Sequence, residues 1–144
     1  MTTRQNIAAL LLTMTAFAYG AIPLVMDWNP THVLHPGWPP HARFHMVWQL
    51  SMSAMLGALV LVMVWWPFGK RGARLKLAAV IGLIVLGGFV VAAFAQEIYS
   101  GAFSEQGSAP PVMGMDVNVL LFTPTIAIHL AACMLAFLPG RVKG

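Results

Sequence analysis

Four of the five histidines lie in one stretch, Asp27 to Ser53, and their spacing suits metal ligands or proton-transfer groups. Two residues separate His32 from His35, and three separate His41 from His45. On a helix the second spacing puts both imidazoles on one face, where they can share a metal ion. One hypothesis is therefore a transition-metal cofactor (zinc, iron or copper) whose ligands come from His32, His35, His41 and His45. Asp27, Glu97 or Asp116 would complete the site.

The same stretch also suits acid–base chemistry without a metal. A histidine titrates near neutral pH and moves protons, and a partly desolvated carboxyl group holds its proton more strongly. In this second hypothesis His41 and His45 are the acid–base groups, and Arg43 orients an oxygen of the substrate. Glu97 or Asp116 supplies the partner carboxylate. The reaction class would be isomerisation or cyclisation of a sterol-, terpene- or quinone-like molecule.

A polar stripe defines the predicted substrate cavity. His41, His45, Gln49 and Ser53 recur every four residues, and polar groups in lipid are costly unless they face protein or water. We therefore expect the stripe to face the interior of a helix bundle. The predicted substrate-binding residues are Gln49, Trp48, Ser53, Thr125 and His129.

A third hypothesis gives these residues no chemistry. The tryptophans of the stretch would form an aromatic belt at the lipid headgroups, and Arg43 would pair with Asp27 or a lipid phosphate. His129, taken alone, is equally typical of a hydrogen bond between helices. The chain would then be a non-catalytic lipid-, metal- or cofactor-binding subunit of a larger membrane complex.

The rest of the chain is strongly apolar. Of 144 residues, 59% are apolar and 8% are charged, whereas roughly a quarter of residues are charged in soluble domains. This composition predicts an all-α integral membrane protein that forms a single four-helix transmembrane bundle. Three pairs of small residues have the spacing that allows helices to approach closely, Ser53/Gly57, Ala78/Gly82 and Gly88/Ala92.

Four apolar segments are long enough to cross about 30 Å of hydrocarbon. The predicted transmembrane helices are 7–26, 42–66, 77–99 and 117–138. An outer loop rich in His, Pro and Trp (27–41), a basic inner loop (67–76) and a second outer loop (100–116) connect them. Pro23 should loosen the end of the first helix. Residues 18–20 also resemble a signal-peptidase site, so a cleaved signal is the alternative for that segment.

The distribution of charge predicts the orientation. Seven of the eight Lys and Arg residues lie near the termini or in 67–76, whereas Arg43 and all four acidic residues lie on the other side. The positive-inside rule then puts both termini in the cytoplasm and the outer loops in the periplasm, lumen or exterior. Topology thus accounts for the net charge of +4, and we expect no nucleic-acid partner. The expected partners are membrane lipids, a lipophilic small molecule, and other copies of the chain or further subunits of a membrane complex.

The run from Asn29 to His45 carries a resemblance. Its Asn-Pro-Thr-His and Trp-Pro-Pro-His-Ala-Arg-Phe-His segments resemble the motif of a family of small, uncharacterised four-helix membrane proteins, loosely similar to DoxX-like proteins. The resemblance implies the four-helix fold and draws attention to His32, His41, Arg43 and His45, but it implies no activity. In plan, although not in motif, the chain is also similar to the emopamil-binding sterol isomerases.

Overall fold

The computed structural model describes residues 3–104 and 110–139. In these residues the fold is all-helical, and four helical stretches are long and apolar enough to cross a membrane. They are Thr3–Met26, Pro40–Trp65, Arg71–Phe94 and Val117–Phe137. The predicted all-α, four-helix architecture is therefore confirmed, and its apolar helices indicate a membrane-embedded protein.

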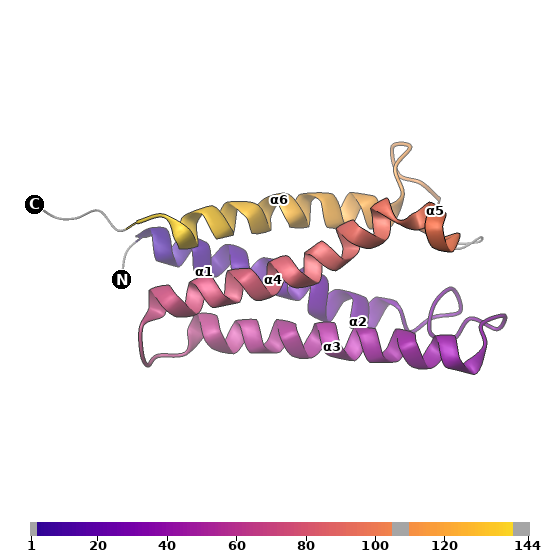
Figure 1. Cartoon of the computed structure of the whole chain (residues 1–144), viewed down its shortest axis with the longest axis horizontal. Coiled ribbons are helices and arrows are strands. Elements are labelled where there is room, and N and C mark those ends of the chain that lie inside the picture. Colours follow the sequence, from indigo (N-terminus) through magenta and orange to yellow (C-terminus); the bar gives the residue numbers. More distant parts are fainter. Residues whose placement is uncertain (1–2, 105–109, 140–144) are drawn as a thin grey trace, which may run out of the picture.

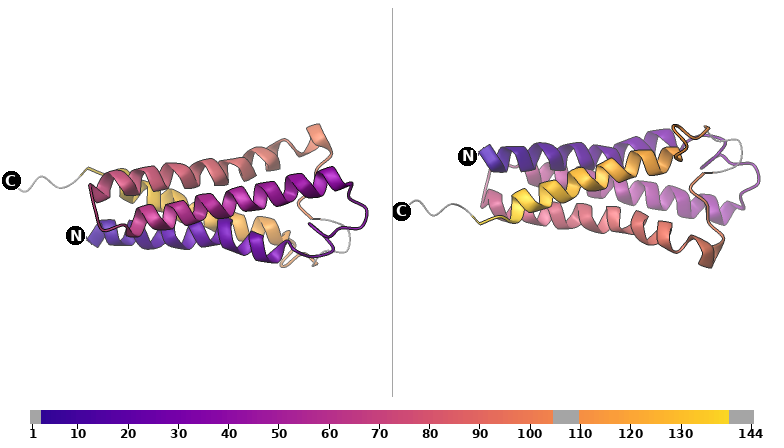
Figure 2. Two further views of the ribbon diagram at one scale, coloured as in Figure 1. Left: turned by 90° about the horizontal axis from the view of Figure 1, so that it is seen from below. Right: turned by 90° about the horizontal axis from the view of Figure 1, so that it is seen from above.

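The four stretches run alternately up and down in one bundle (Figure 1), and the further views in Figure 2 agree. Within it α1 (Thr3–Ala16) contacts α3 (Pro40–Trp65), α4 (Arg71–Phe94) and α6 (Val117–Phe137). At one end the Arg4 guanidinium donates a hydrogen bond of 2.7 Å to the Pro139 carbonyl. We call this the termini end. The opposite end carries the loop of residues 27–39, and we call it the histidine end.

Alanines share the core with larger residues such as Leu12 and Leu75, and many large apolar residues cover the outside. Ala9, Ala78 and Ala132, from three helices, are fully buried, whereas Phe17, Val91 and Met134 are at least half exposed. Lipid solvates large apolar side chains well, so close packing of small residues holds such helices together. This distribution fits a bundle surrounded by lipid.

The first long helix widens near the histidine end. α1 leads into a π-helical turn, η1 (Phe17–Ala21), and then into α2 (Ile22–Met26). Pro23 has no N–H, and its ring would press on the carbonyl four residues earlier. In the wider turn the Ile22 N–H bonds instead to the Phe17 carbonyl, five residues back. The predicted loosening at Pro23 is present, and it falls in the turn before the proline.

Glycines set the distance between this widened turn and α3. A Cβ on Gly20 would lie 3.2 Å from the Ser53 carbonyl oxygen, and one on Gly57 would lie 3.0 Å from the Ala16 carbonyl oxygen. The predicted pair Ser53/Gly57 therefore lies in a close helix contact. A Cβ on Gly88 would meet no described atom within 4 Å.

The predicted basic inner loop is shorter than expected. Residues 71–76 form the first turns of α4, and the connection from α3 spans only residues 66–70. The reason is Arg74, whose guanidinium reaches back to the Met63 carbonyl in the last turn of α3 and to the Trp66 and Phe68 carbonyls in the connection. Helical backbone from Arg71 onward places the guanidinium there.

The predicted third span, 77–99, is two helices. α4 ends at Phe94, and a short helix, α5 (Gln96–Tyr99), follows. Ala95 between them has φ −94° and ψ 4°, outside the helical region, so the backbone breaks there. α5 carries Glu97 on an exposed position.

Candidate functional site

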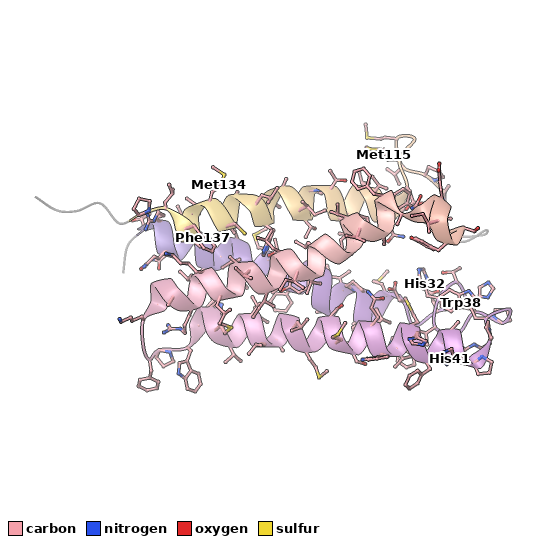
Figure 3. All side chains as sticks on the ribbon, in the orientation of Figure 1. His32, Trp38, His41, Met115, Met134 and Phe137 are labelled. Atoms are coloured by element: carbon pink, nitrogen blue, oxygen red, sulfur yellow. The ribbon has the colours of Figure 1, made fainter. Side chains whose placement is uncertain are left out.

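The histidine-rich loop packs at one end of the bundle. Figure 3 shows His32 and Trp38 on the loop before α3, with His41 at the start of that helix. Pro39 is the N-cap and Pro40 opens the helix, where a missing N–H costs little. The loop closes on itself through a hydrogen bond of 3.0 Å from the Val33 N–H to the Asp27 carbonyl.

Asp27 and His32 face each other in this loop. Asp27 Oδ1 lies 4.0 Å from His32 Nε2, and the two side chains are 22% and 28% exposed. On the other side of the ring, Nδ1 lies 2.9 Å from the Thr31 hydroxyl, which donates to Asn29 Oδ1 at 2.7 Å. The Asn29 amide donates to the Met26 carbonyl at 2.6 Å. The turn at Asn29 and Thr31 thus orients His32 toward the carboxylate.

Burial raises the pKa of the Asp27 carboxyl group above its ordinary value of 3.8, and the neighbouring His32 opposes that shift. The charged carboxylate loses water in this position, so the group keeps its proton at a higher pH than an exposed aspartate does. A carboxyl group and an imidazole held together in this way can exchange protons with a bound molecule. The carboxylate that faces a histidine is Asp27, whereas the sequence predicted Glu97 or Asp116.

His35 and Arg43 tie the loop to α3. The Arg43 guanidinium donates through Nη2 to the His35 carbonyl at 2.7 Å and to the Pro36 carbonyl at 3.4 Å. Its Nε is buried and has no hydrogen-bond partner among the described residues. The His35 ring lies 5.7 Å from the Trp38 ring. Arg43 therefore binds loop carbonyls and not Asp27, one of its two predicted partners.

His41 and His45 pair on the exposed side of α3. Their Nε2 atoms are 3.1 Å apart, and the rings meet edge to face with centroids 4.5 Å apart. The ring of His45 also stacks on that of Trp48 at 5.7 Å. The two imidazoles share one helix face, as their spacing predicted.

The polar stripe on α3 does not face the interior, which corrects the prediction. His41, His45 and Gln49 are exposed, and only Ser53 is buried. A step of four residues turns about 40° beyond a full circle, so Ser53 points about 120° away from His41. The buried face of α3 instead follows alternating steps of three and four through Leu50, Ser53, Gly57, Val60 and Val64.

His129 joins three helices and is 1% exposed. Its Nε2 donates to the Ala79 carbonyl of α4 at 2.9 Å, because a carbonyl only accepts. Its Nδ1 then accepts from the Thr15 hydroxyl of α1, also at 2.9 Å. A Cβ on Gly82 would lie 2.2 Å from Cε1 of this ring, so the ring lies directly on the α4 backbone. This is the bond between helices expected for a lone histidine, and both nitrogens are used within the protein.

The other predicted site residues lie in separate places. Asp116 caps α6, since its Oδ1 accepts from the Asn118 N–H at 2.8 Å. The Thr125 hydroxyl is buried and donates to the Leu121 carbonyl within α6. Within the part of the chain that the structure describes, Glu97 makes no hydrogen bond or ion pair.

The predicted four-histidine metal site is not assembled. In residues 3–104 and 110–139, no three His, Cys, Asp or Glu side chains form a group that could hold a metal ion. His32 faces Asp27, His35 lies against Trp38, and the remaining two histidines face each other. The His41–His45 pair does bring two ring nitrogens within 3.1 Å of each other.

Two partners escaped prediction from the sequence. The sequence predicts Asp27 only as a metal ligand or as a partner of Arg43, although the Asn-Pro-Thr turn is a signal that the chain folds back on itself there. No prediction from the sequence involves Thr15. Its signal is the spacing of the buried residues on the first helix, because Leu12, Thr15 and Tyr19 follow steps of three and four.

Comparison with curated proteins and with solved structures gives no match. The resemblance to DoxX-like proteins remains a prediction. A family of unknown function, DUF6640, matches residues 11–133. This range includes the pairs Asp27–His32, His35–Trp38 and His41–His45. The predicted membership of an uncharacterised family is thus confirmed. The chain belongs to the DUF6640 family.

Proposed function

We propose that this protein is an integral membrane enzyme that performs acid–base chemistry on a hydrophobic small molecule at the histidine end. The proposed substrate is sterol-, terpene- or quinone-like, and the proposed reaction is an isomerisation or cyclisation. The observation that carries this proposal is the partly buried Asp27–His32 pair. Asp27 directly follows α2, the last part of the helix that forms one wall of an apolar groove.

The groove supplies a place for the apolar body of such a molecule. It measures about 230 Å³ and lies between the first long helix and α3, with Leu24 and Ala21 on one wall and Ala54 and Ala58 on the other. A second depression of about 270 Å³ shares Ala21 and continues along α2 to Met26. Both are lined by apolar residues and open to the outside of the bundle, so a molecule dissolved in the membrane can enter from the side.

The helix leads from the groove to the acid–base pair. At 1.5 Å per residue, Leu24 is about 4.5 Å along the axis from Asp27. A lipophilic molecule lying in the groove would therefore bring a polar or unsaturated end close to the carboxyl group and the imidazole. The Nε2–Oδ1 separation of 4.0 Å exceeds hydrogen-bond length, and such separations commonly shorten when substrate binds.

The proposed roles follow from the two environments. Asp27, which keeps its proton more strongly than an exposed aspartate, donates a proton to the substrate. His32, held by Thr31, removes a proton from a neighbouring carbon, and the proton then returns to Asp27. The net reaction moves a double bond and consumes no proton. His41, His45 and Arg43 are not needed for this step.

Charge distribution supports an outward-facing site. Among the described residues, the termini end carries Arg4 and the four basic residues of 70–76, whereas the histidine end carries the acidic residues and Arg43. The positive-inside rule then puts the termini end in the cytoplasm. The proposed site faces the periplasm or an equivalent luminal or exterior compartment, in the plasma membrane or bacterial inner membrane.

Deuterium transfer tests the proposal on a mixture of candidate substrates. The protein, in lipid nanodiscs, is incubated in D2O with a sterol, isoprenoid and quinone fraction extracted from membranes, and the products are analysed by mass spectrometry. We expect the wild-type protein to label or isomerise one lipophilic species. Asp27→Asn and His32→Gln should abolish this labelling, because each removes one proton-transfer group and retains the size of the side chain.

His35→Gln is the matched control, since His35 lies in the same loop but faces Trp38. It should retain the labelling. The proposal fails if the wild-type protein labels nothing in the extract, or if Asp27→Asn and His32→Gln label the same species at the wild-type rate.

One observation favours a second function, that of a non-catalytic subunit in a larger membrane complex. Gly88 and Ala92 lie one turn apart on an exposed part of α4, and a Cβ on Gly87 or Gly88 would meet no described atom within 4 Å. Such small surfaces let another transmembrane helix approach. Gly88→Leu should release a partner from the complex isolated in mild detergent, whereas Ile84→Leu on the same helix should not.

A further inference from the structure

The ring nitrogens of His41 and His45 lie close enough to share one metal ion. The two Nε2 atoms are 3.1 Å apart. A metal ion at 2.0–2.1 Å from both nitrogens would subtend an angle of about 95–102° between them, given that separation. This angle lies between the values for octahedral or square-planar coordination and for tetrahedral coordination, so the separation of the two nitrogens suits a transition metal.

Aromatic neighbours pack against the ring of His45. The ring of His45 lies 5.8 Å from that of Phe44, edge to face, and 5.7 Å from that of Trp48, stacked. Both histidines lie in the first turns of α3, which begin at Pro40 with a preset backbone angle. A chelating pair on one rigid helix loses little conformational freedom when it binds an ion.

We propose that His41 and His45 bind a divalent transition-metal ion of the imidazole-preferring class (zinc, copper or nickel) at the exposed surface of α3. Neutral imidazole is the ligand form. Without metal, the Nε2–H of one ring donates to Nε2 of the other. On binding, that proton moves through solvent to Nδ1 of the same ring, so both Nε2 lone pairs meet the ion and no proton is released.

Water or an added molecule fills the remaining coordination positions. Among the described residues no third His, Cys, Asp or Glu joins the pair, so the site has open positions, as catalytic and exchangeable metal sites do. We expect binding weaker than that of a closed structural site with four protein ligands. The site is separate from Asp27 and His32, and the inference does not depend on the proposed function.

Copper is the probe of choice because it gives the highest affinity for nitrogen ligands among these ions. The protein is purified with a tag that contains no histidine, titrated with Cu²⁺ in mild detergent, and examined by electron paramagnetic resonance. We expect about one strongly bound ion per chain with nitrogen hyperfine structure from imidazole. His41→Gln and His45→Gln should each weaken binding by more than about tenfold.

The glutamine variants separate chelation from a structural hydrogen bond. Glutamine keeps a donor and an acceptor, so the variants should melt at the wild-type temperature without metal, whereas Zn²⁺ should raise the melting temperature of the wild type alone. His35→Gln and Asp27→Asn should bind Cu²⁺ like the wild type. The inference is overturned if the glutamine variants keep wild-type affinity, or if binding is lost in His35→Gln instead.

Discussion

The buried imidazole of His129 shows how one polar residue can be accommodated in an apolar bundle. Ala79 O and the Thr15 hydroxyl satisfy its two nitrogens from two different helices. Gly82 provides the space, because any side chain there would overlap the ring. Without these contacts the imidazole would be an unsatisfied polar group in lipid. Ala79, Thr15 and Gly82 therefore accommodate His129 together, as one unit.

Replacing Gly82 with alanine should therefore disturb this unit. The added Cβ would lie 2.2 Å from His129 Cε1, so the ring or α4 must move. We expect Gly82→Ala to lower the free energy of unfolding by about 1–3 kcal/mol, as overpacking does. Chemical denaturation of both proteins in detergent measures this difference in the free energy of unfolding. Gly88→Ala is the control and should cause no loss, because its Cβ would meet no described atom; equal losses in both variants would contradict the argument.

The carboxyl group of Asp27 should make stability depend on pH. Folding raises its pKa above 3.8, so the folded state binds the proton more strongly than the unfolded state does. This contribution is fully present below pH 3.8 and is lost as the pH rises through the raised pKa. Asp27→Asn stays neutral, so at neutral pH it should melt above the wild type, and the gap should close in acid.

Thermal melting in detergent across this pH range checks that expectation. Glu97→Gln is the control, since that exposed side chain should leave the melting temperature unchanged. A lower melting temperature for Asp27→Asn at neutral pH would show that attraction to His32 outweighs the cost of burying the charge.

At the scale of elements, Arg74 organises the connection between α3 and α4. The last carbonyls of a helix lack backbone partners. Its guanidinium donates to the Met63 carbonyl at 3.0 Å and to the Trp66 carbonyl at 2.5 Å, and it also binds Phe68. One residue of α4 thus closes the end of α3 and shapes the five residues between them.

Arg74→Lys should loosen this connection while leaving the bundle intact. A lysine keeps the charge but has no fork of donors that can reach three carbonyls. At about 1 kcal/mol for each lost hydrogen bond, amides at the end of α3 should exchange with deuterium at least about fivefold faster. Arg71→Lys is the control, because Arg71 makes a single bond to Asn6. If the amides at the end of α3 exchanged at the same rate in both variants, Arg74 would not be the residue that stabilises this connection.

The elements themselves were largely predictable, but their ends were not. Hydropathy locates each span because about 30 Å of lipid requires a long uncharged run. It says nothing about where a helix stops outside the lipid, so it predicts a loop for the basic residues 71–76, which form the first turns of α4. The π-helical turn before Pro23 is likewise one of several ways in which a helix can avoid the clash between a proline ring and the carbonyl four residues earlier. The sequence does not show which way is used.

For the molecule as a whole, the sequence predicts which segments carry the candidate site. It does not predict which of their side chains face each other. Clustering predicted the loop and the start of α3, and helix spacing predicted that His41 meets His45. Pairing between Asp27 and His32 depends on a turn between them, and the burial of His129 depends on Thr15 and Gly82 from other helices. Contacts between distant segments require the packed bundle, which periodicity along one helix does not describe.

Orientation in the membrane is the prediction at this largest scale. If the positive-inside rule holds, the histidine end faces away from the cytoplasm. In a Cys133→Ala background, Pro30→Cys at the histidine end should react with an impermeant maleimide on intact cells. Phe68→Cys, 70% exposed at the termini end, should react only after the membrane is opened.

Ile84→Cys supplies the lipid-facing control and should stay unlabelled in both conditions. Its side chain is 68% exposed halfway along α4, so its thiol would face hydrocarbon, where the reagent does not enter. If Phe68→Cys reacted on intact cells and Pro30→Cys only after the membrane was opened, the bundle would have the opposite orientation. The Asp27–His32 pair would then act on molecules of the cytoplasmic leaflet, and the His41–His45 pair would bind metal from the cytoplasm.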